Sequence, residues 1–318
     1  MPPRGTPLPR TGGVKTTVVL HPVDLPGVRE ALSAINAIEL LCPADDHGVT
    51  EALHTAPVLV SRRWRADYLQ EGLRWVQTLS AGYEQFPVGT LREAGVALST
   101  ASGLHAVVAE HAIGLLLTLT RDIHRSMADG TERRWNPHDA AELAGRTIVL
   151  VGLGAIGEAI ARRLEPWDVR LIGITRTPGH RLGNLQDVRP LGGLVQASRE
   201  ASALIVCIAS SPETRHLVSG EVLDALGPGW VVNVSRGAVV DEPALVARLV
   251  DGRLLGAGLD VFGREPLPTQ SLLWQLPNVV CTPHMAGMSP RYARRLAELL
   301  THNLLAFDGR APWRNRVC

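Results

Sequence analysis

Residues 147–157 read Thr-Ile-Val-Leu-Val-Gly-Leu-Gly-Ala-Ile-Gly, an apolar run that passes directly into the spacing Gly-x-Gly-x-x-Gly. The run predicts a strand, and residues 156–164 predict a helix behind it. In such a motif the glycines permit a tight turn, the approach of a pyrophosphate to the backbone, and close packing of helix on strand. A second strand predicted at 169–174 completes the βαβ context in which this motif binds dinucleotides. The predicted cofactor contacts in the loop are Gly152, Gly154, Ala155, Ile156 and Gly157.

The end of that second strand indicates which dinucleotide binds. An NAD site usually carries a carboxylate there for the ribose 2′-hydroxyl, but this chain has Thr175-Arg176-Thr177. No carboxylate would repel a 2′-phosphate, and Arg176 could pair with one, with His180 and Arg181 just beyond. We therefore expect NADP in preference to NAD, with Thr175 and Arg176 in the site. The alternative is that Arg176 stacks on the adenine or faces water.

Composition sets wider limits. The chain has 318 residues, 45% hydrophobic and 20% charged residues and a formal net charge of +1. This describes a globular protein large enough for two domains, with no global charge that favours nucleic acid. No stretch approaches the ~18–20 apolar residues of a membrane span. The four cysteines lack metal-like spacing, so we expect free thiols, no metal site and a cytoplasmic location.

The rest of the chain alternates apolar strands with helical stretches, which is typical of parallel sheets covered on both faces. Strands are predicted at 17–20, 38–42, 56–61, 74–80 and 96–100 in the first part, and at 147–151, 169–174, 203–208, 230–234, 256–259 and 279–281 in the second. Residues 107–120 predict a buried or interface helix, and 121–143 a surface arm. A last helix is predicted at 291–305 and could return to the first domain.

Three segments in the second part end in residues suited to proton transfer and to binding an anion. They are Val231-Val-Asn-Val-Ser-Arg236-Gly237, Gly258-Leu-Asp260-Val-Phe-Gly-Arg-Glu265-Pro266 and Cys281-Thr-Pro-His284-Met-Ala-Gly287. A guanidinium can hold a carboxylate by paired hydrogen bonds. An imidazole exchanges a proton near neutral pH, and a neighbouring carboxylate can orient it. Singly, Arg236 could cap a strand, Glu265 could lie in a surface turn, and His284 could be a buried structural histidine.

Together, these segments and the glycine loop resemble the D-isomer-specific 2-hydroxyacid dehydrogenase family, including its glyoxylate and hydroxypyruvate reductases. The likeness extends over nearly the whole chain from Thr16 and includes Val108-Ala-Glu-His111 and Asn233–Glu242. It implies two doubly wound parallel-sheet domains, a Rossmann cofactor domain at 103–284 inserted in a flavodoxin-like substrate domain at 16–102 plus 285–318. Residues 1–15 would be a disordered tail. It also implies a homodimer, with the 107–120 helix and the arm in the interface.

The resemblance gives each residue a role in hydride transfer between NAD(P)H and a small 2-oxoacid or D-2-hydroxyacid. Arg236 would bind the substrate carboxylate and carbonyl, His284 would act as acid and base, and Glu265 would hold His284 in its protonated form. Asp260 would lie on the nicotinamide side of the cofactor site. Two further residues, Ala81 and Gly82, would hold the substrate carboxylate through their backbone N–H groups.

Other functions stay open at this point. A phosphorylated hydroxyacid could be the substrate if Arg62 and Arg63 met a phosphate, although they could equally be surface residues. The chain could also be a dinucleotide-sensing binding protein, as a related group of corepressors is. Glu265 stands where formate dehydrogenases carry a glutamine, which argues against formate. Tyr83, Trp64, Leu104 and His105 are the candidates to line the pocket for the substrate side chain.

Overall fold

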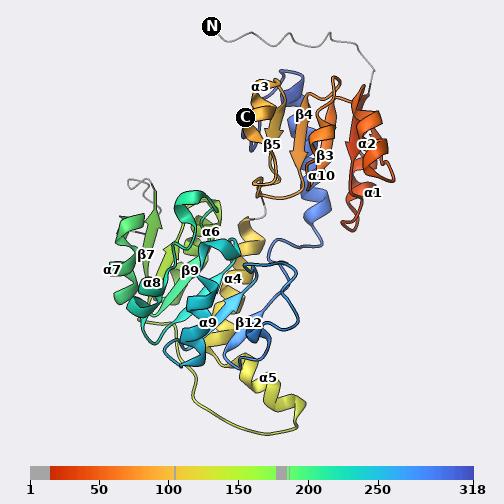
Figure 1. Ribbon diagram of the computed structural model, residues 1–318. Coiled ribbons are helices and arrows are strands. Elements are labelled where there is room, and N and C mark those ends of the chain that lie inside the picture. The colour runs from red at the N-terminus through yellow and green to blue at the C-terminus, as the bar shows by residue number, and fades with distance from the viewer. Residues whose placement is uncertain (1–14, 104, 177–184, 186) are drawn as a thin grey trace. The chain divides into compact units, whose positions relative to one another are not determined.

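The computed structural model describes residues 15–103, 105–176, 185 and 187–318. They form two compact units (Figure 1). One unit comprises the chain before residue 105 together with residues from Ser289 onward, and the other comprises residues 105–288. The predicted tail at 1–15 falls almost wholly outside the described residues.

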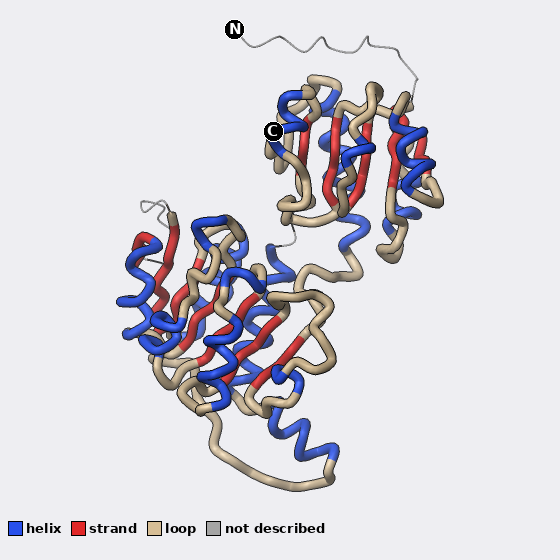
Figure 2. The backbone as a smooth tube through the Cα atoms, viewed as in Figure 1, coloured by secondary structure: helices blue, strands red, loops and turns tan. Residues whose placement is uncertain are grey.

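Each unit is built on one sheet whose strands all run parallel, with helices on both of its faces (Figure 2). This confirms the predicted α/β class. The chain alternates strand and helix because each strand is apolar throughout, and a strand buried on both faces needs a helix packed on each side.

The first unit has five strands in the order β2-β1-β3-β4-β5. Its strands are β1 (Thr16–Leu20), β2 (Ile38–Leu41), β3 (Val58–Ser61), β4 (Trp75–Thr78) and β5 (Ala97–Ser99), and its helices are α1 (Val28–Ser33), α2 (Asp46–Leu53), α3 (Val88–Glu93) and α10 (Tyr292–Phe307). Alternate strand residues serve opposite faces of the sheet. Val18 and Leu20 join the cluster with α1 and α10, whereas Val19 joins the one with α2 and α3.

Helix α10 belongs to the first unit although it comes last in the sequence, and a buried polar contact fixes it there. Asn303 is fully buried, and its side-chain amide donates to the Gln77 Oε1 on β4 at 3.3 Å. The same side chain accepts from the Arg314 N–H at 2.9 Å and so holds the chain that follows the helix. The first unit is therefore discontinuous in sequence.

The second unit has seven strands in the order β12-β11-β10-β9-β6-β7-β8. Its strands are β6 (Thr147–Val151), β7 (Arg170–Thr175), β8 (Asp187–Pro190), β9 (Ala203–Val206), β10 (Trp230–Asn233), β11 (Gly256–Leu259) and β12 (Val279–Cys281). Helices α4 (His105–Thr120) and α6 (Ala155–Leu164) cover one face, and α7 (Leu194–Arg199), α8 (Gly220–Leu226) and α9 (Glu242–Val250) cover the other.

Several short elements were not predicted from the sequence. They are α2, α3, α7, β8 and α5 (Ile123–Thr131), the last of which lies within the stretch predicted as a surface arm. A helix of six to nine residues offers only one or two apolar positions to the core, too few for a helical period to stand out. Among the described residues, none of the helices combines the length and the apolar character that a membrane crossing needs.

Candidate active site

The glycine loop joins β6 to α6 with the geometry expected of a phosphate-binding turn. Gly152 has φ of +111°, and a Cβ there would lie 2.6 Å from the Ile208 nitrogen. A Cβ on Gly157 would lie 2.2 Å from the Gly152 oxygen, whereas one on Gly154 would meet no atom within 4 Å. Gly154 is the N-cap of α6 and provides no side-chain cap. The first and third glycines therefore serve packing, and the second leaves open space where a pyrophosphate can approach Ala155 and Ile156 at the positive end of the helix.

The other predicted residues of this unit follow strands of the same sheet. Arg236 follows β10, Asp260 follows β11, and His284 lies three residues after β12, and these three strands are neighbours. Because all the strands are parallel, their carboxyl ends share one edge with the glycine loop after β6 and with Arg176 after β7. The fold thus brings five separate sequence segments to one edge.

The imidazole of His284 is oriented by Glu265. Its Nδ1 lies 2.6 Å from Glu265 Oε2, and the other carboxylate oxygen accepts the Phe262 N–H at 3.1 Å. A carboxylate only accepts, so Nδ1 carries the proton and the reactive position is Nε2. The side chain is 46% exposed, which leaves it accessible to a ligand. The pair has the arrangement of a general acid or base with its orienting group.

Asp260 lies beneath this histidine and is only 1% exposed. Its carboxylate accepts three hydrogen bonds, from Thr282 Oγ1 at 2.6 Å and from the N–H groups of Met285 and Ala286, each at 2.9 Å. It therefore clamps the loop on both sides of His284, whose own backbone has φ of +50°. The sequence resemblance placed Asp260 beside the cofactor, whereas its contacts in the described structure are with this loop.

Helix α4 adds a second layer to the clamp. His111 Nε2 lies 2.9 Å from Thr282 Oγ1 and 3.5 Å from Asp260 Oδ1. Since the Thr282 hydroxyl donates to Asp260, Nε2 of His111 must donate to Thr282. Thr282 was quoted in the sequence motif without a role. A hydroxyl two residues before a candidate catalytic histidine is the only signal the sequence offered for it.

Arg236 extends from a turn organised by Asn233. The Asn233 side chain, 1% exposed, accepts from the Ser235 N–H at 3.0 Å and donates to the Arg236 carbonyl at 3.1 Å. A Cβ on Gly237 would lie 1.9 Å from the Phe262 carbonyl carbon, so this turn touches the loop that carries Glu265. The backbone contact explains the glycine after Arg236 and links two of the catalytic segments. Sequence reasoning assigned no role to Asn233, although an asparagine two residues before Ser235 is the signature of an Asx turn.

Thr175 and Arg176 end β7 as predicted, and Arg176 is 57% exposed. Its guanidinium lies 3.8 Å from the carboxylate of Glu213, on the short 3₁₀ helix η4 (Pro212–Thr214). His180 and Arg181 lie outside the described residues.

Ala81 and Gly82 belong to the first unit, in the loop after β4. The Ser80 hydroxyl donates to the Gly82 carbonyl at 2.6 Å, and the Tyr292 hydroxyl donates to the Leu79 carbonyl at 2.5 Å. Among the described residues, neither the Ala81 nor the Gly82 N–H has a hydrogen-bond acceptor. The loop is therefore held at both ends with two donors available to an anion.

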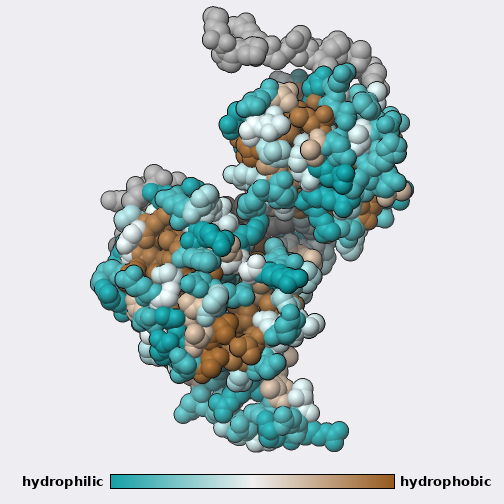
Figure 3. Space-filling model, in the orientation of Figure 1, coloured by the Kyte–Doolittle hydropathy of each residue, from teal (hydrophilic) through white to brown (hydrophobic). Residues whose placement is uncertain are grey.

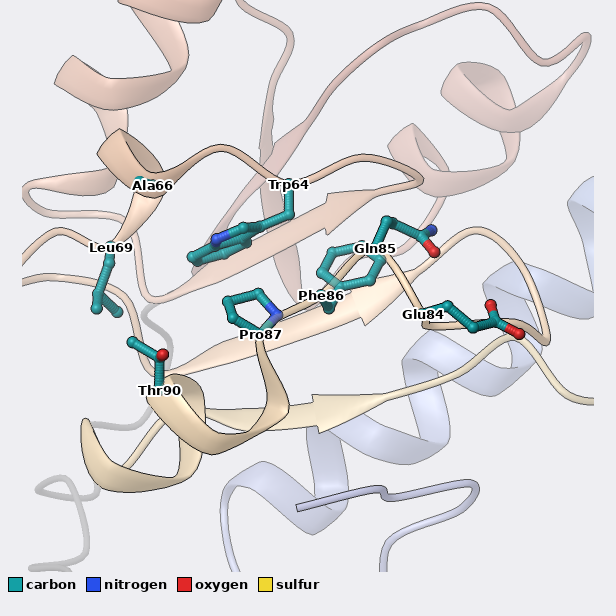
Figure 4. Close-up of a pocket in the computed structure, with 8 residues that line it drawn as sticks. All are labelled: Trp64, Ala66, Leu69, Glu84, Gln85, Phe86, Pro87 and Thr90. Atoms are coloured by element: carbon teal, nitrogen blue, oxygen red, sulfur yellow. The ribbon is translucent and has the colours of Figure 1, made fainter. Parts of the chain in front are cut away.

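Figure 4 shows a cavity of about 470 Å³ in the first unit, with the Trp64 indole on one side and Phe86 and Pro87 on the other. Its lining consists of Trp64, Ala66, Leu69, Glu84, Gln85, Phe86, Pro87 and Thr90. The lining contains no cation, so the cavity suits an apolar group rather than a carboxylate. Of the residues predicted to line a pocket, Trp64 is in this cavity, Tyr83 is not, Leu104 is not described, and nothing is described of the His105 side chain.

The exposed surface elsewhere carries two features relevant to function. Arg62 is ion-paired with Asp24, and Arg63 lies 2.8 Å from Asp46, so both arginines already have acidic partners. The second unit has apolar surface over α9 (Figure 3), beside a shallow groove that includes Val246, Val250 and Leu272. Neither place combines the cations and proton-transfer groups of the sheet edge.

Comparison with known proteins identifies relatives. A family model described as D-isomer specific 2-hydroxyacid dehydrogenase, NAD binding domain, matches residues 113–286. The chain is 32% identical to a glyoxylate reductase of Thermofilum pendens over 303 residues, 91% of this chain and 84% of that one. It is 30% identical to glyoxylate/hydroxypyruvate reductase B of Yersinia enterocolitica, over 92% of this chain and 94% of the relative. The crystal structure of an NADPH-dependent glyoxylate/hydroxypyruvate reductase from Sinorhizobium meliloti, in complex with NADP and malonate, superposes with a TM-score of 0.84 at 32% identity, over 96% of this chain and 97% of that one.

Proposed function

The chain belongs to the D-isomer specific 2-hydroxyacid dehydrogenase family, and we propose that it reduces small 2-oxoacids such as glyoxylate or hydroxypyruvate with NADPH in preference to NADH. The observation that carries the proposal is the His284–Glu265 pair, 2.6 Å apart, on the sheet edge that also bears the glycine loop and Arg236. The relatives named above as reductases support the reaction class, and the corepressor-like alternative is not favoured.

The residues fit a dinucleotide. Gly154 leaves room above the loop, and the uncapped start of α6 supplies N–H groups for a pyrophosphate. When bound, the nicotinamide supplies or accepts the hydride. Arg176, at the end of β7, is the group that would meet a 2′-phosphate, and this is our reason for placing NADPH before NADH. In this proposal residues 103–284 form the dinucleotide domain and the remainder forms the substrate domain.

The protein's own part in the reaction is to hold the oxoacid and to move one proton. We assign the substrate carboxylate and carbonyl to the Arg236 guanidinium, which can offer paired N–H donors, with the Ala81 and Gly82 N–H groups as further donors. His284 Nε2 would donate a proton to the carbonyl oxygen during reduction and remove it during oxidation. Glu265 would stabilise the imidazolium and fix its orientation through Nδ1.

A phosphorylated hydroxyacid is a weaker candidate. It needs a cation for the phosphate, and the two arginines considered for that role are paired with Asp24 and Asp46. We keep it as an outcome of the substrate test rather than as a second proposal.

The substrate test is a spectrophotometric assay with NADPH and NADH against a panel of 2-oxoacids, phosphorylated ones included. Turnover with glyoxylate or hydroxypyruvate and a higher kcat/KM for NADPH are expected. Tight dinucleotide binding without turnover of any oxoacid would instead favour the sensor. Arg236→Ala should raise KM and lower kcat, while Arg236→Lys, which keeps the charge and loses the fork, should recover only part of the activity.

We also propose that the protein is a cytoplasmic homodimer. The stretch after α4 exposes apolar side chains that water does not favour: Ile123 is 45% exposed, Met127 67% and Trp135 95%. Burying them against a second copy would remove this apolar surface from water. Sedimentation of the full chain tests the assembly, and charged substitutions at Met127 and Trp135 should shift it toward the monomer.

A further inference from the structure

The end of β7 carries an acidic partner for the cationic side chain assigned to the cofactor phosphate. Glu213 Oε2 lies 3.8 Å from Arg176 Nη1. Glu213 comes from η4, which follows β9, while Arg176 follows β7, and these two strands flank β6 in the sheet. The ion pair therefore joins the segments on either side of the strand that leads into the glycine loop.

Glu213 is held in place by the turn that bears it. The Ser211 N–H donates to Thr214 Oγ1 at 2.8 Å, and the Thr214 N–H donates back to Ser211 Oγ at 3.3 Å, which forms a capping box. The Thr214 hydroxyl also donates to the Ala209 carbonyl at 2.9 Å, and Thr214 is fully buried. A carboxylate between these anchored residues keeps its negative charge near the end of β7.

From this arrangement we propose that Glu213 is a specificity-determining residue that opposes the NADPH preference given by Arg176, an inference that rests on the proposed function. A 2′-phosphate approaching Arg176 must compete with the Glu213 carboxylate for the same guanidinium and is repelled by its charge. The unphosphorylated ribose of NADH meets no such repulsion, and its hydroxyls can donate to a carboxylate. Glu213 thus narrows the difference between the two dinucleotides and keeps NADH usable.

The two side chains are 57% and 60% exposed, so solvent and salt screen their interaction. The effect of removing Glu213 is correspondingly modest. We expect Glu213→Gln to tighten binding of a 2′-phosphorylated ligand by about three- to tenfold, because one screened ion pair and one screened repulsion are lost.

Calorimetric titration of the full chain with adenosine 2′,5′-bisphosphate and with 5′-AMP tests this without turnover, since the ligands differ only in the 2′-phosphate. Glu213→Gln should bind the bisphosphate about three- to tenfold more tightly and leave 5′-AMP within twofold of the parent protein. Glu165→Gln is the matched control, because it removes an exposed carboxylate that follows α6, at the amino edge of the sheet. It should change neither affinity.

Unchanged or weaker bisphosphate binding in Glu213→Gln would overturn the inference, and weaker binding would mean that Glu213 orients Arg176 instead. The gain should also vanish when Arg176→Gln is combined with Glu213→Gln. The proposed NADPH preference fails separately, if Arg176→Gln alone leaves bisphosphate binding unchanged. The reductase function itself depends on the oxoacid assay and on neither titration.

Discussion

Asp260→Asn separates two roles for the carboxylate under the candidate catalytic loop. As a clamp, Asp260 accepts from Thr282 Oγ1 and from the Met285 and Ala286 N–H groups. An asparagine of the same shape keeps one oxygen, which can still accept from Thr282 and Met285. Its amide nitrogen then faces the Ala286 N–H, so that bond is lost and a donor in a residue only 4% exposed is left unsatisfied.

The magnitude follows from these contacts. An unsatisfied buried donor costs about 1–3 kcal/mol, and hydrogen bonds to a charged acceptor contribute more than neutral ones. We therefore expect the free energy of unfolding to fall by about 2–4 kcal/mol in the ligand-free protein. His284 lies in the released loop, so kcat should fall at least about tenfold, with the dinucleotide Kd changed by less than about threefold.

Urea unfolding without cofactor measures the stability, and amide exchange locates the damage, which should appear first at Met285 and Ala286. Asp241→Asn is the matched control, since Asp241 caps α9 through the Ala244 N–H at 3.1 Å and asparagine caps a helix equally well. The clamp would be refuted by an Asp260→Asn variant that keeps its ligand-free stability within about 0.5 kcal/mol and instead loses dinucleotide affinity. That result would return Asp260 to the cofactor site.

Three further predictions concern the same sheet edge. Gly157→Ala should destabilise the fold, because its Cβ would lie 2.2 Å from a backbone oxygen, whereas Gly154→Ala should keep the parent Tm and weaken dinucleotide binding by filling open space; comparing Tm and Kd of the two variants checks this, and equal losses of Tm would contradict it. His284→Ala should lower kcat by about 10²–10⁴-fold with dinucleotide binding intact, and Glu265→Gln, which can still accept from Nδ1, should cost only about tenfold; steady-state kinetics decide, and a larger loss in Glu265→Gln than in His284→Ala would reverse the roles. Burial raises the pKa of the Cys207 thiol to about 12, so it stays protonated at pH 8 and should resist iodoacetamide until guanidinium unfolds the chain; mass spectrometry after alkylation reads this out, and rapid native labelling would show that the site opens.

The sequence was sufficient for the elements whose signal is local. The run 147–157 predicts a strand, a turn and a helix, and the structure has β6 and α6 within one residue of the predicted limits. The strands at 256–259 and 279–281 were also placed correctly, because each is an apolar run between turn residues. Helix α2 was missed even though Asp45 caps it with a 2.8 Å bond to the Gly48 N–H, since only two of its residues are buried and they make no clear period.

The site was predictable in its residue types and not in its contacts. Arg236, Asp260 and His284 each follow an apolar strand, and neighbouring parallel strands must bring their carboxyl ends to one edge, so the sequence justified placing them together. Which way a side chain points there depends on partners far away in sequence. Nothing near Asp260 in sequence indicates that its carboxylate meets N–H groups 25 and 26 residues later.

Gly237 shows why such contacts lie beyond sequence patterns. As part of an Arg-Gly pair it resembles an ordinary turn glycine, and its φ is not positive, so backbone freedom does not explain it. The reason is a close approach, since any Cβ there would overlap the Phe262 carbonyl carbon at 1.9 Å. That approach exists only because β10 and β11 pair in a register that sets Asn233 opposite Leu259, which brings the two following loops together. The glycine, the register and the position of Glu265 three residues beyond Phe262 are therefore one constraint, which local sequence reveals only as an unexplained small residue.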